Sequence, residues 1–479
     1  MKLKKPRLVL FEEYGLNAHT IKSLKLLILA VAFGVVHFNI ITGIALAGYL
    51  RSIGTSDFIL GLLFAIGPII SPMQLVASYL LERTRQRKAM LIGVGILQRS
   101  AWLPFGLAPF FIPMESFTLR IWMAALLLLI SAFSNPFVNV SFFSLAADLV
   151  PDHIRGRYFA VRMRVSTVCG ILGGVLVAWL LDNLSLYFSY ALVFALAGTM
   201  GILDIVCYFG VKFPEMAKSD EKKENFWKML GNVLKNKPYM RFIGFMTFWL
   251  FSINLSAPFI LVHLREGVLL SNTLITVAVQ ILPNICSVLI LPRWGRSLDE
   301  HGNKTVMQLA NGILCFAPFL WIFTANNPIS IVFIMFIGIM HGLLLPGFDL
   351  GANNIMLSHA PKVNRSMYIA MYFMCTSIIG IGLANVTGGW LLQNVFIHAE
   401  LANFTLAGVN LTRFNFLFAL TAILRCVMVY IALPRMIKEE RGTSAMTLLR
   451  DIVKQTKKRI RRMRLNVLAM VRTIRRRGW

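Results

Sequence analysis

Long apolar runs separated by short polar breaks organise most of the chain. Each of twelve runs reaches about 20 consecutive, mostly apolar residues, the length an α-helix needs to cross the hydrocarbon core of a bilayer. The runs cover residues 22–50, 57–81, 89–111, 119–147, 158–182, 187–213, 240–264, 271–294, 305–325, 328–357, 366–397 and 412–434. A longer polar break divides them into six and six. The pattern predicts an all-α membrane protein with two six-helix bundles.

The same pattern predicts five segments along the chain. They are a cytoplasmic N-terminal segment (1–21), an N-terminal bundle (22–213), a cytoplasmic linker (214–239), a C-terminal bundle (240–436) and a basic amphipathic cytoplasmic tail (437–479). In the tail, apolar residues recur every three or four positions among many lysines and arginines, which is typical of a basic amphipathic helix. A helix tethered to the inner leaflet meets anionic lipid first, so we expect lipid contact rather than nucleic-acid binding.

Composition and charge agree with a membrane location. Of the 479 residues, 57% are hydrophobic and 14% are charged, against about 25% charged in soluble domains. Forty-two of the 48 lysines and arginines lie in the termini, the linker and alternate loops, whereas only Arg51, Arg120, Arg265 and Arg413 lie in the other loops. This positive-inside bias predicts a multi-pass cell-membrane protein with both termini in the cytoplasm. The net charge of +27 therefore needs no nucleic acid to explain it.

No motif in the sequence indicates an enzyme, a metal or a cofactor. The six cysteines lie within apolar runs and form no C-x-x-C pair, so they predict neither a disulfide framework nor a metal site. The chain has no Gly-Lys dipeptide and therefore no Walker A loop, and it lacks H-E-x-x-H and G-x-S-x-G.

The two halves repeat in sequence. An offset of 217 places Gly95-Ile96-Leu97 on Gly312-Ile313-Leu314, and an offset of 211 places Trp179-Leu180-Leu181 on Trp390-Leu391-Leu392. Matches at nearly one offset, in the same order, indicate duplicated halves.

Two charged loops occupy equivalent places in the halves. Residues 78–88 contain Glu82-Arg83 and Arg87-Lys88, and residues 295–304 contain Asp299 and Lys304. Both resemble the loop 2–3 motif of the major facilitator superfamily, roughly G-x-x-x-D-R-x-G-R-K, although neither copy is perfect. Asp148, followed by Pro151 and Arg155-Gly156-Arg157, resembles the loop 4–5 motif of that family.

The resemblance implies a fold and a function. It implies twelve transmembrane helices in two pseudo-symmetric bundles, with a substrate site between them at mid-membrane. The implied activity is secondary transport of a small molecule by alternating access, in a protein expected to be a monomer. The motif residues would form a cytoplasmic ion-pair network that controls access: Glu82, Arg83, Arg87, Asp148, Arg155, Asp299 and Lys304. The alternative is that these charges serve only as topological signals.

In this family the first, fourth, seventh and tenth helices line the cavity. Polar residues expected there to bind substrate are His37, Asn135, Asn139, Asn254, His341 and Asn353. Asn135 and Asn139 are four residues apart and share a helix face. His37 and Asn39 are two apart, so only one of them is expected to face the cavity.

Four ionisable residues lie inside the spans, where an unpaired charge is costly. Arg99 and Asp204 are at similar depth, as are Arg425 and Asp349, and both pairs are candidates for buried ion pairs. Asp349 also shares a helix stripe with His341, so it is the candidate for proton coupling. A receptor or scaffold that acts through its basic tail is the alternative to a transporter.

Overall fold

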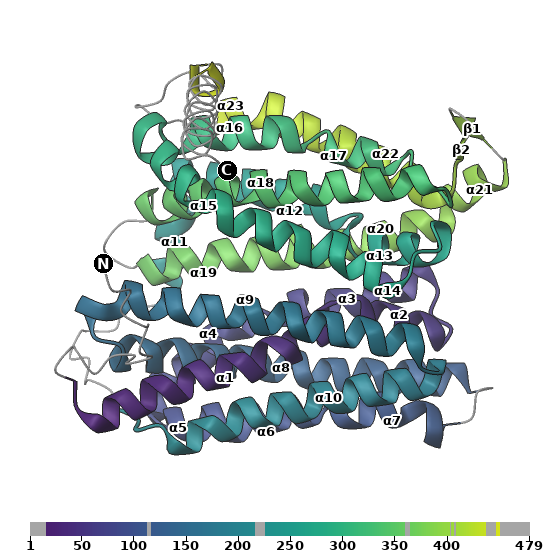
Figure 1. Cartoon of the computed structure of the whole chain (residues 1–479). Helices are drawn as coiled ribbons and strands as arrows, with labels where there is room; N and C mark the ends of the chain where they lie inside the picture. Colours follow the sequence, from purple (N-terminus) through teal and green to yellow (C-terminus); the bar gives the residue numbers. More distant parts are fainter. Residues whose placement is uncertain are drawn as a thin grey trace, which may run out of the picture.

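The computed structural model describes residues 16–112, 116–215, 226–359, 365–402, 404–406, 409–436 and 447–450. The described chain is almost entirely helical, and Figure 1 shows the long helices running side by side in two groups. The first group contains α1 (Ala18–Thr42), α2 (Ile44–Ser52), α3 (Asp57–Ile70), α4 (Met73–Thr84), α5 (Arg87–Ala89), η2 (Met90–Val94), α6 (Gly95–Ser100), α7 (Trp102–Phe111), α8 (Phe117–Leu149), α9 (Asp152–Asn183), α10 (Leu186–Cys207) and η3 (Tyr208–Gly210).

The second group follows a linker helix, α11 (Phe226–Lys235). It contains α12 (Lys237–Asn254), α13 (Ala257–Val262), η4 (His263–Gly267), α14 (Asn272–Thr276), η5 (Val277–Ile281), α15 (Leu282–His301), α16 (Asn303–Leu314), α17 (Ala317–Trp321), α18 (Pro328–His359), α19 (Arg365–Cys375), η6 (Thr376–Leu383), α20 (Ala384–Asn394), α21 (Phe396–Leu401), α22 (Arg413–Cys426), η7 (Val427–Ala432) and α23 (Leu433–Met436). A short antiparallel pair, β1 (Thr405–Leu406) and β2 (Val409–Asn410), precedes α22.

Eleven spans in the described part of the chain are long and apolar enough to cross a membrane. The remaining pass is the pair α16–α17, which is interrupted at Cys315 and Phe316. Pro318 lies in the first turn of the second piece, as expected because proline has no N–H and clashes with the preceding turn. With this pass the fold has twelve transmembrane segments in two six-helix bundles, as the sequence predicted.

Backbone geometry repeats between the bundles. Among described residues, positive φ angles occur at Gly54 (85°) and Leu269 (60°), and at Arg85 (55°) and Gly302 (85°). The members of each pair are 215 and 217 residues apart, close to the sequence offset. Arg85 thus adopts the left-handed conformation that the second copy of the motif gives to glycine.

The two ends of the molecule differ in how the bundles meet. We call the end that carries the loops at Arg85 and Gly302 the basic end, and the end that carries β1, β2 and α21 the hairpin end (Figure 1). Near the hairpin end one hydrophobic cluster joins both bundles, from Tyr49 and Phe194 to Phe259 and Phe418. Towards the basic end each bundle has a separate cluster. Among the described residues, a shared hydrophobic cluster therefore joins the bundles at the hairpin end, and separate clusters fill them towards the basic end.

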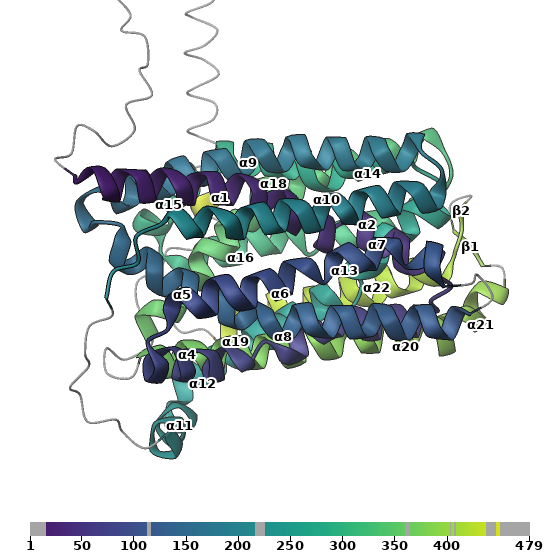
Figure 2. The same cartoon turned by 90° about the horizontal axis from the view of Figure 1, so that it is seen from below.

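Segments outside the spans pack on the basic end. The linker contains a helix that the polar sequence of 214–239 did not predict, and Val233 of this helix is buried against the second bundle. Figure 2 shows α11 projecting beside α12. Leu448 is buried near Trp294, but the predicted amphipathic tail otherwise lies outside the described residues.

Candidate substrate cavity and inter-bundle gate

One cavity, which we call the large cavity, is lined by residues of the second bundle and has a volume of about 530 Å³. Its walls are mostly apolar, formed by residues such as Ile260, Ile334 and Ile337. Polar groups enter at a few places only: Asn284, Ser287, His341, Asp349 and Arg425. An apolar cavity with few polar groups is typical of a small-molecule site.

A second cavity of about 300 Å³ lies between the bundles. Asn39 and Thr42 of α1 line it from the first bundle, and Gln280 and Asn284 line it from the second. Asn284 lines both cavities. The two spaces are therefore adjacent, and together they expose polar groups of both bundles.

The structure places His37 away from the inter-bundle cavity, contrary to the expected position, and places Asn39 there instead. The His37 side chain is fully buried inside the first bundle, where Nδ1 lies 2.8 Å from the carbonyl oxygen of Ala197. Asn39 lines the inter-bundle cavity and donates a hydrogen bond to the Gly170 carbonyl at 3.1 Å. The two-residue spacing lets only one of the two side chains face the cavity. Packing against α10 buries His37, so Asn39 is the one that does.

The other predicted substrate residues lie in different settings. Asn135 and Asn139 are exposed on α8, and Asn135 accepts a hydrogen bond from Gln98 at 3.0 Å. Asn254 is half-buried and donates to the Leu250 carbonyl of its own helix at 2.8 Å. Asn353 is exposed on α18. Of the six residues, His341 lines the large cavity, and its Nδ1 lies 3.0 Å from the Ile337 carbonyl oxygen.

The two predicted buried ion pairs have different outcomes. Arg99 Nη2 lies 2.9 Å from Asp204 Oδ2, with both side chains largely buried. Arg425 forms no ion pair with Asp349, although both line the large cavity. Asp349 and Arg425 are a similar number of residues from the basic end of their helices. This does not bring their side chains together, because α18 is a 32-residue helix and the span of α22 to α23 is shorter.

At the basic end, Asp148 pairs with Arg87. The Arg87 side chain is 4% exposed and its Nη2 donates to Asp148 Oδ2. Lys304 donates to the Pro434 carbonyl at 3.1 Å, and Arg83 and Asp299 are exposed. The side chains of Glu82 and Arg155 lie outside the described residues. The described ion pair thus holds α8 within the first bundle.

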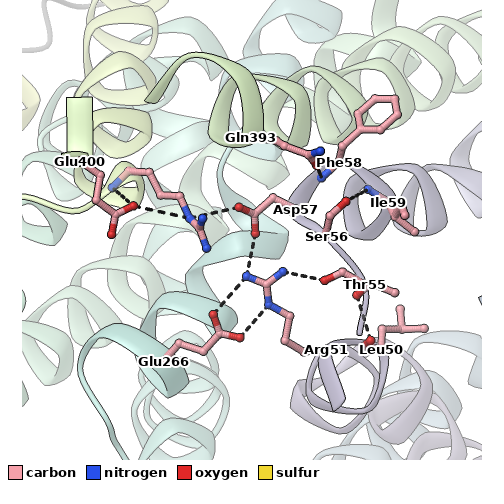
Figure 3. Close-up of polar contacts among 11 residues, drawn as sticks. Leu50, Arg51, Thr55, Ser56, Asp57, Phe58, Ile59, Glu266, Gln393 and Glu400 are labelled. Atoms are coloured by element: carbon pink, nitrogen blue, oxygen red, sulfur yellow. Dashed lines mark hydrogen bonds and ion pairs between the residues drawn. The ribbon is translucent and has the colours of Figure 1, made fainter. Parts of the chain in front are cut away.

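The hairpin end carries an ion-pair chain that the sequence did not predict (Figure 3). Asp57, whose side chain is 3% exposed, forms ion pairs with Arg51 (Oδ1 to Nη2, 2.8 Å) and with Arg413 (Oδ2 to Nε, 3.1 Å). Arg51 also pairs with Glu266 at 2.7 Å, and Arg413 lies 3.9 Å from Glu400. The chain of charges therefore alternates in sign and crosses from the first bundle to the second twice.

Two further contacts cross the same end and are related by the internal repeat. Asp182, at the end of α9, accepts hydrogen bonds of 2.8–2.9 Å from the backbone and side chains of Asn272 and Thr273, where α14 begins. Gln393, at the end of α20, accepts one of 3.1 Å from the backbone of Phe58, where α3 begins. Asp182 and Gln393 are 211 residues apart, the offset of the duplicated Trp-Leu-Leu sequence. We call these two contacts the helix-end latches.

Close helix packing completes the hairpin end. A Cβ atom at Gly61 of α3 would lie 2.3 Å from the Asn385 carbonyl oxygen, and one at Gly389 of α20 would lie 2.4 Å from the Asp57 carbonyl oxygen. Only glycine permits this backbone approach. The hairpin end is therefore closed by apolar, charged and backbone contacts together.

Sequence comparison matches residues 26–282 to the Major Facilitator Superfamily. A protein of Lactococcus lactis subsp. lactis (strain IL1403) described as a "Multi-drug resistance efflux pump PmrA homolog" is 30% identical over 149 residues. That alignment covers 28% of this chain and only 34% of the relative.

Several solved transporter structures share the fold. A mutant of the nucleoside transporter NupG superimposes with a TM-score of 0.67 at 14% identity, covering 87% of this chain and all of that chain. The D-xylose–proton symporter gives 0.65 at 12% identity, covering 88% and 100% of the two chains. A bacterial homologue of the human lysosomal transporter Spinster, in an inward-facing and unoccupied conformation, gives 0.60 at 15% identity, covering 88% and 96%.

Proposed function

Because the chain belongs to the Major Facilitator Superfamily, we propose that it is a secondary active transporter that moves a small organic solute by alternating access. The observation that carries the proposal is the asymmetry of the two ends around a cavity. The bundles share a hydrophobic cluster and cross-bundle ion pairs at the hairpin end, and they have separate clusters towards the basic end. A transporter caught in one access state has this form.

We place the protein in the cell membrane as a monomer with both termini in the cytoplasm. The charge bias of the loops supports this orientation. With the basic end inside, the closed hairpin end faces outward, and the structure corresponds to an inward-facing state. The charged motif at the basic end then serves as the opposite gate, with Arg87 and Asp148 as its described ion pair.

Proton coupling through Asp349 extends the proposal. Asp349 lines the cavity on α18, eight residues from His341. A carboxylate at this depth is disfavoured unless it is paired or protonated for part of the cycle. No ion pair of Asp349 occurs within the described ranges, and the residue is exposed at the cavity, so this carboxyl group is accessible to exchange a proton. The polar groups of the cavity favour transport over the receptor or scaffold alternative, which would need none.

Electron spin resonance distances test alternating access. Spin labels at Leu184 and Leu269 report the hairpin end, and labels at Thr84 and Arg296 report the basic end, in a background without the six native cysteines. We expect two distance populations for each pair, with the hairpin-end distance lengthening whenever the basic-end distance shortens, as pH is stepped. Single, fixed distances at both ends under all conditions would support a scaffold instead.

A further inference from the structure

Arg425 is a buried cation with no counter-charge among the described residues. Its side chain lies on α22 and the residue is 5% exposed. Nε has no hydrogen-bond partner, and the described part of the chain provides no ion pair to this guanidinium. Its guanidinium carbon lies 6.0 Å from the centroid of the Trp249 ring, a contact that only partly replaces hydration. A buried charge without a partner is strongly destabilising, so pairing the guanidinium with an anion is favourable.

The first bundle contains a buried arginine that has a counter-charge. Arg99 is also largely buried, and Asp204 lies 2.9 Å from it. The second bundle carries an acid as well, Asp349, but this acid lies on the same cavity wall without reaching Arg425. Because Asp349 is eight residues beyond His341, it is about 12 Å farther along α18. The two charges are thus held apart, one at each of two places in the cavity.

The cavity around Arg425 is open to a ligand. Arg425 is one of its lining residues, together with His341, Asn284 and Ser287. The remaining walls are mostly apolar, with Ile334 and Ile337 among them. The volume of about 530 Å³ lies in the range of drug-sized ligands. The cavity therefore offers one position that favours an anionic group, at Arg425, and this position lies beside a large apolar space.

We propose that the substrate is an amphipathic organic acid: a monocarboxylate whose carboxylate pairs with Arg425 and whose apolar body packs on the walls at Ile334 and Ile337. The inference rests on the proposed transport function, because it assigns the cavity to the transported solute. Arginine binds a carboxylate through two parallel N–H···O bonds, which lysine does not reproduce. A carboxylate that arrives with a proton on Asp349 adds no net charge to the membrane interior.

Isosteric ligands test the proposal by direct binding. The purified full chain in nanodiscs is titrated with 3-phenylpropionate, 3-phenylpropanamide and 3-phenylpropylamine by calorimetry. We expect the acid to bind at least about tenfold more tightly than the amide, and the amine to bind most weakly. In Arg425→Gln the acid should lose this preference. Arg296→Gln, which removes an exposed arginine at the basic end, should keep it.

Each other outcome counts against the proposal. Equal binding of acid and amide, a preference that survives in Arg425→Gln, or no binding of the acid overturns the substrate class. Binding of chloride at this site without binding of the acid makes an inorganic anion the partner instead. If Arg425→Gln does not fold, Arg425→Lys supplies the test, with a weakened preference expected. None of these results bears on the two-state distances, so failure of the substrate class remains distinct from failure of transport.

Discussion

Three arginines are exceptions to the charge bias of the loops, and their ion-pair partners explain their positions. Arg51, Arg265 and Arg413 lie at the end that the positive-inside rule leaves poor in basic residues, and each is paired with an acid there. The sequence shows these residues as exceptions, but it does not show which acids meet them. The partners lie between 6 and 356 residues away in the chain, and only the packing of the bundles brings them together.

Residue-level prediction named two ion pairs, each within one bundle, and the structure contains one of them. Equal depth suggested the pair Arg99 with Asp204, which is present, and the pair Arg425 with Asp349, which is not. Depth counted along a helix does not include helix length, tilt or the side-chain face. For the same reason spacing left His37 and Asn39 as alternatives until packing buried the histidine.

Asp349→Asn separates coupling from structure at the residue scale. Because Asp349 supports no ion pair within the described residues, we expect the free energy of unfolding to change by less than about 1 kcal/mol. Exchange of solute across proteoliposomes should continue, whereas accumulation driven by a proton gradient should fall to background. Glu215→Gln, which removes an exposed acid in the linker outside the charged motif, is the control and should retain accumulation. Unaltered proton-driven accumulation in Asp349→Asn would exclude the coupling role.

At the scale of elements, the duplication accounts for both latches. The last turn of α9 and the last turn of α20 descend from the same repeated segment, and each places a side-chain oxygen on the first backbone N–H groups of a helix in the other bundle. Exposed N–H groups and the helix dipole make a helix start a good site for an oxygen acceptor. The offset was readable from sequence, but the contact was not, because it joins different elements.

Asp182→Ala should loosen the hairpin end. The carboxylate accepts four hydrogen bonds across the bundle interface, and losing them should cost about 2 kcal/mol, or roughly 30-fold in the equilibrium between access states. The measurement is the fraction of long distances between labels at Leu184 and Leu269. Asn183→Ala is the control, because the Asn183 side chain donates only to Trp179 of its own helix. Equal populations in the two variants would remove the latch from the gate.

Gly61→Ala tests the close approach of α3 and α20. The added methyl would meet the Asn385 carbonyl at 2.3 Å, so the closed hairpin end should be destabilised by about 1–3 kcal/mol. Labels at Leu184 and Leu269 should then move apart, and the basic end should close. Gly67→Ala, on the same helix with nothing within 4 Å of the added atom, should leave the distances unchanged. A closed hairpin end in both variants would contradict the prediction.

For the whole molecule, the sequence predicted the fold but not the access state, that is, which end of the molecule is closed. Apolar run lengths and the six-plus-six division were sufficient for the architecture, and the one irregular pass, α16–α17, still follows the pattern. Which end is closed was not predictable, because both access states have the same sequence and differ by only a few kcal/mol. The duplicated charges of the basic loops drew attention to that end, whereas the cross-bundle ion pairs among the described residues lie at the other.

Orientation in the membrane follows from charge and is tested on intact cells. Forty-two of 48 basic residues lie on the side of the basic end or in the segments that join it, so we expect Gln86→Cys and Asn303→Cys to resist a membrane-impermeant maleimide. Leu184→Cys and Leu269→Cys, in loops at the hairpin end, should react, each in the cysteine-free background. Detergent permeabilisation should then expose positions 86 and 303, which shows that those thiols are reactive once reached. Labelling of positions 86 and 303 before permeabilisation would reverse the orientation, and the structure would then represent an outward-facing state.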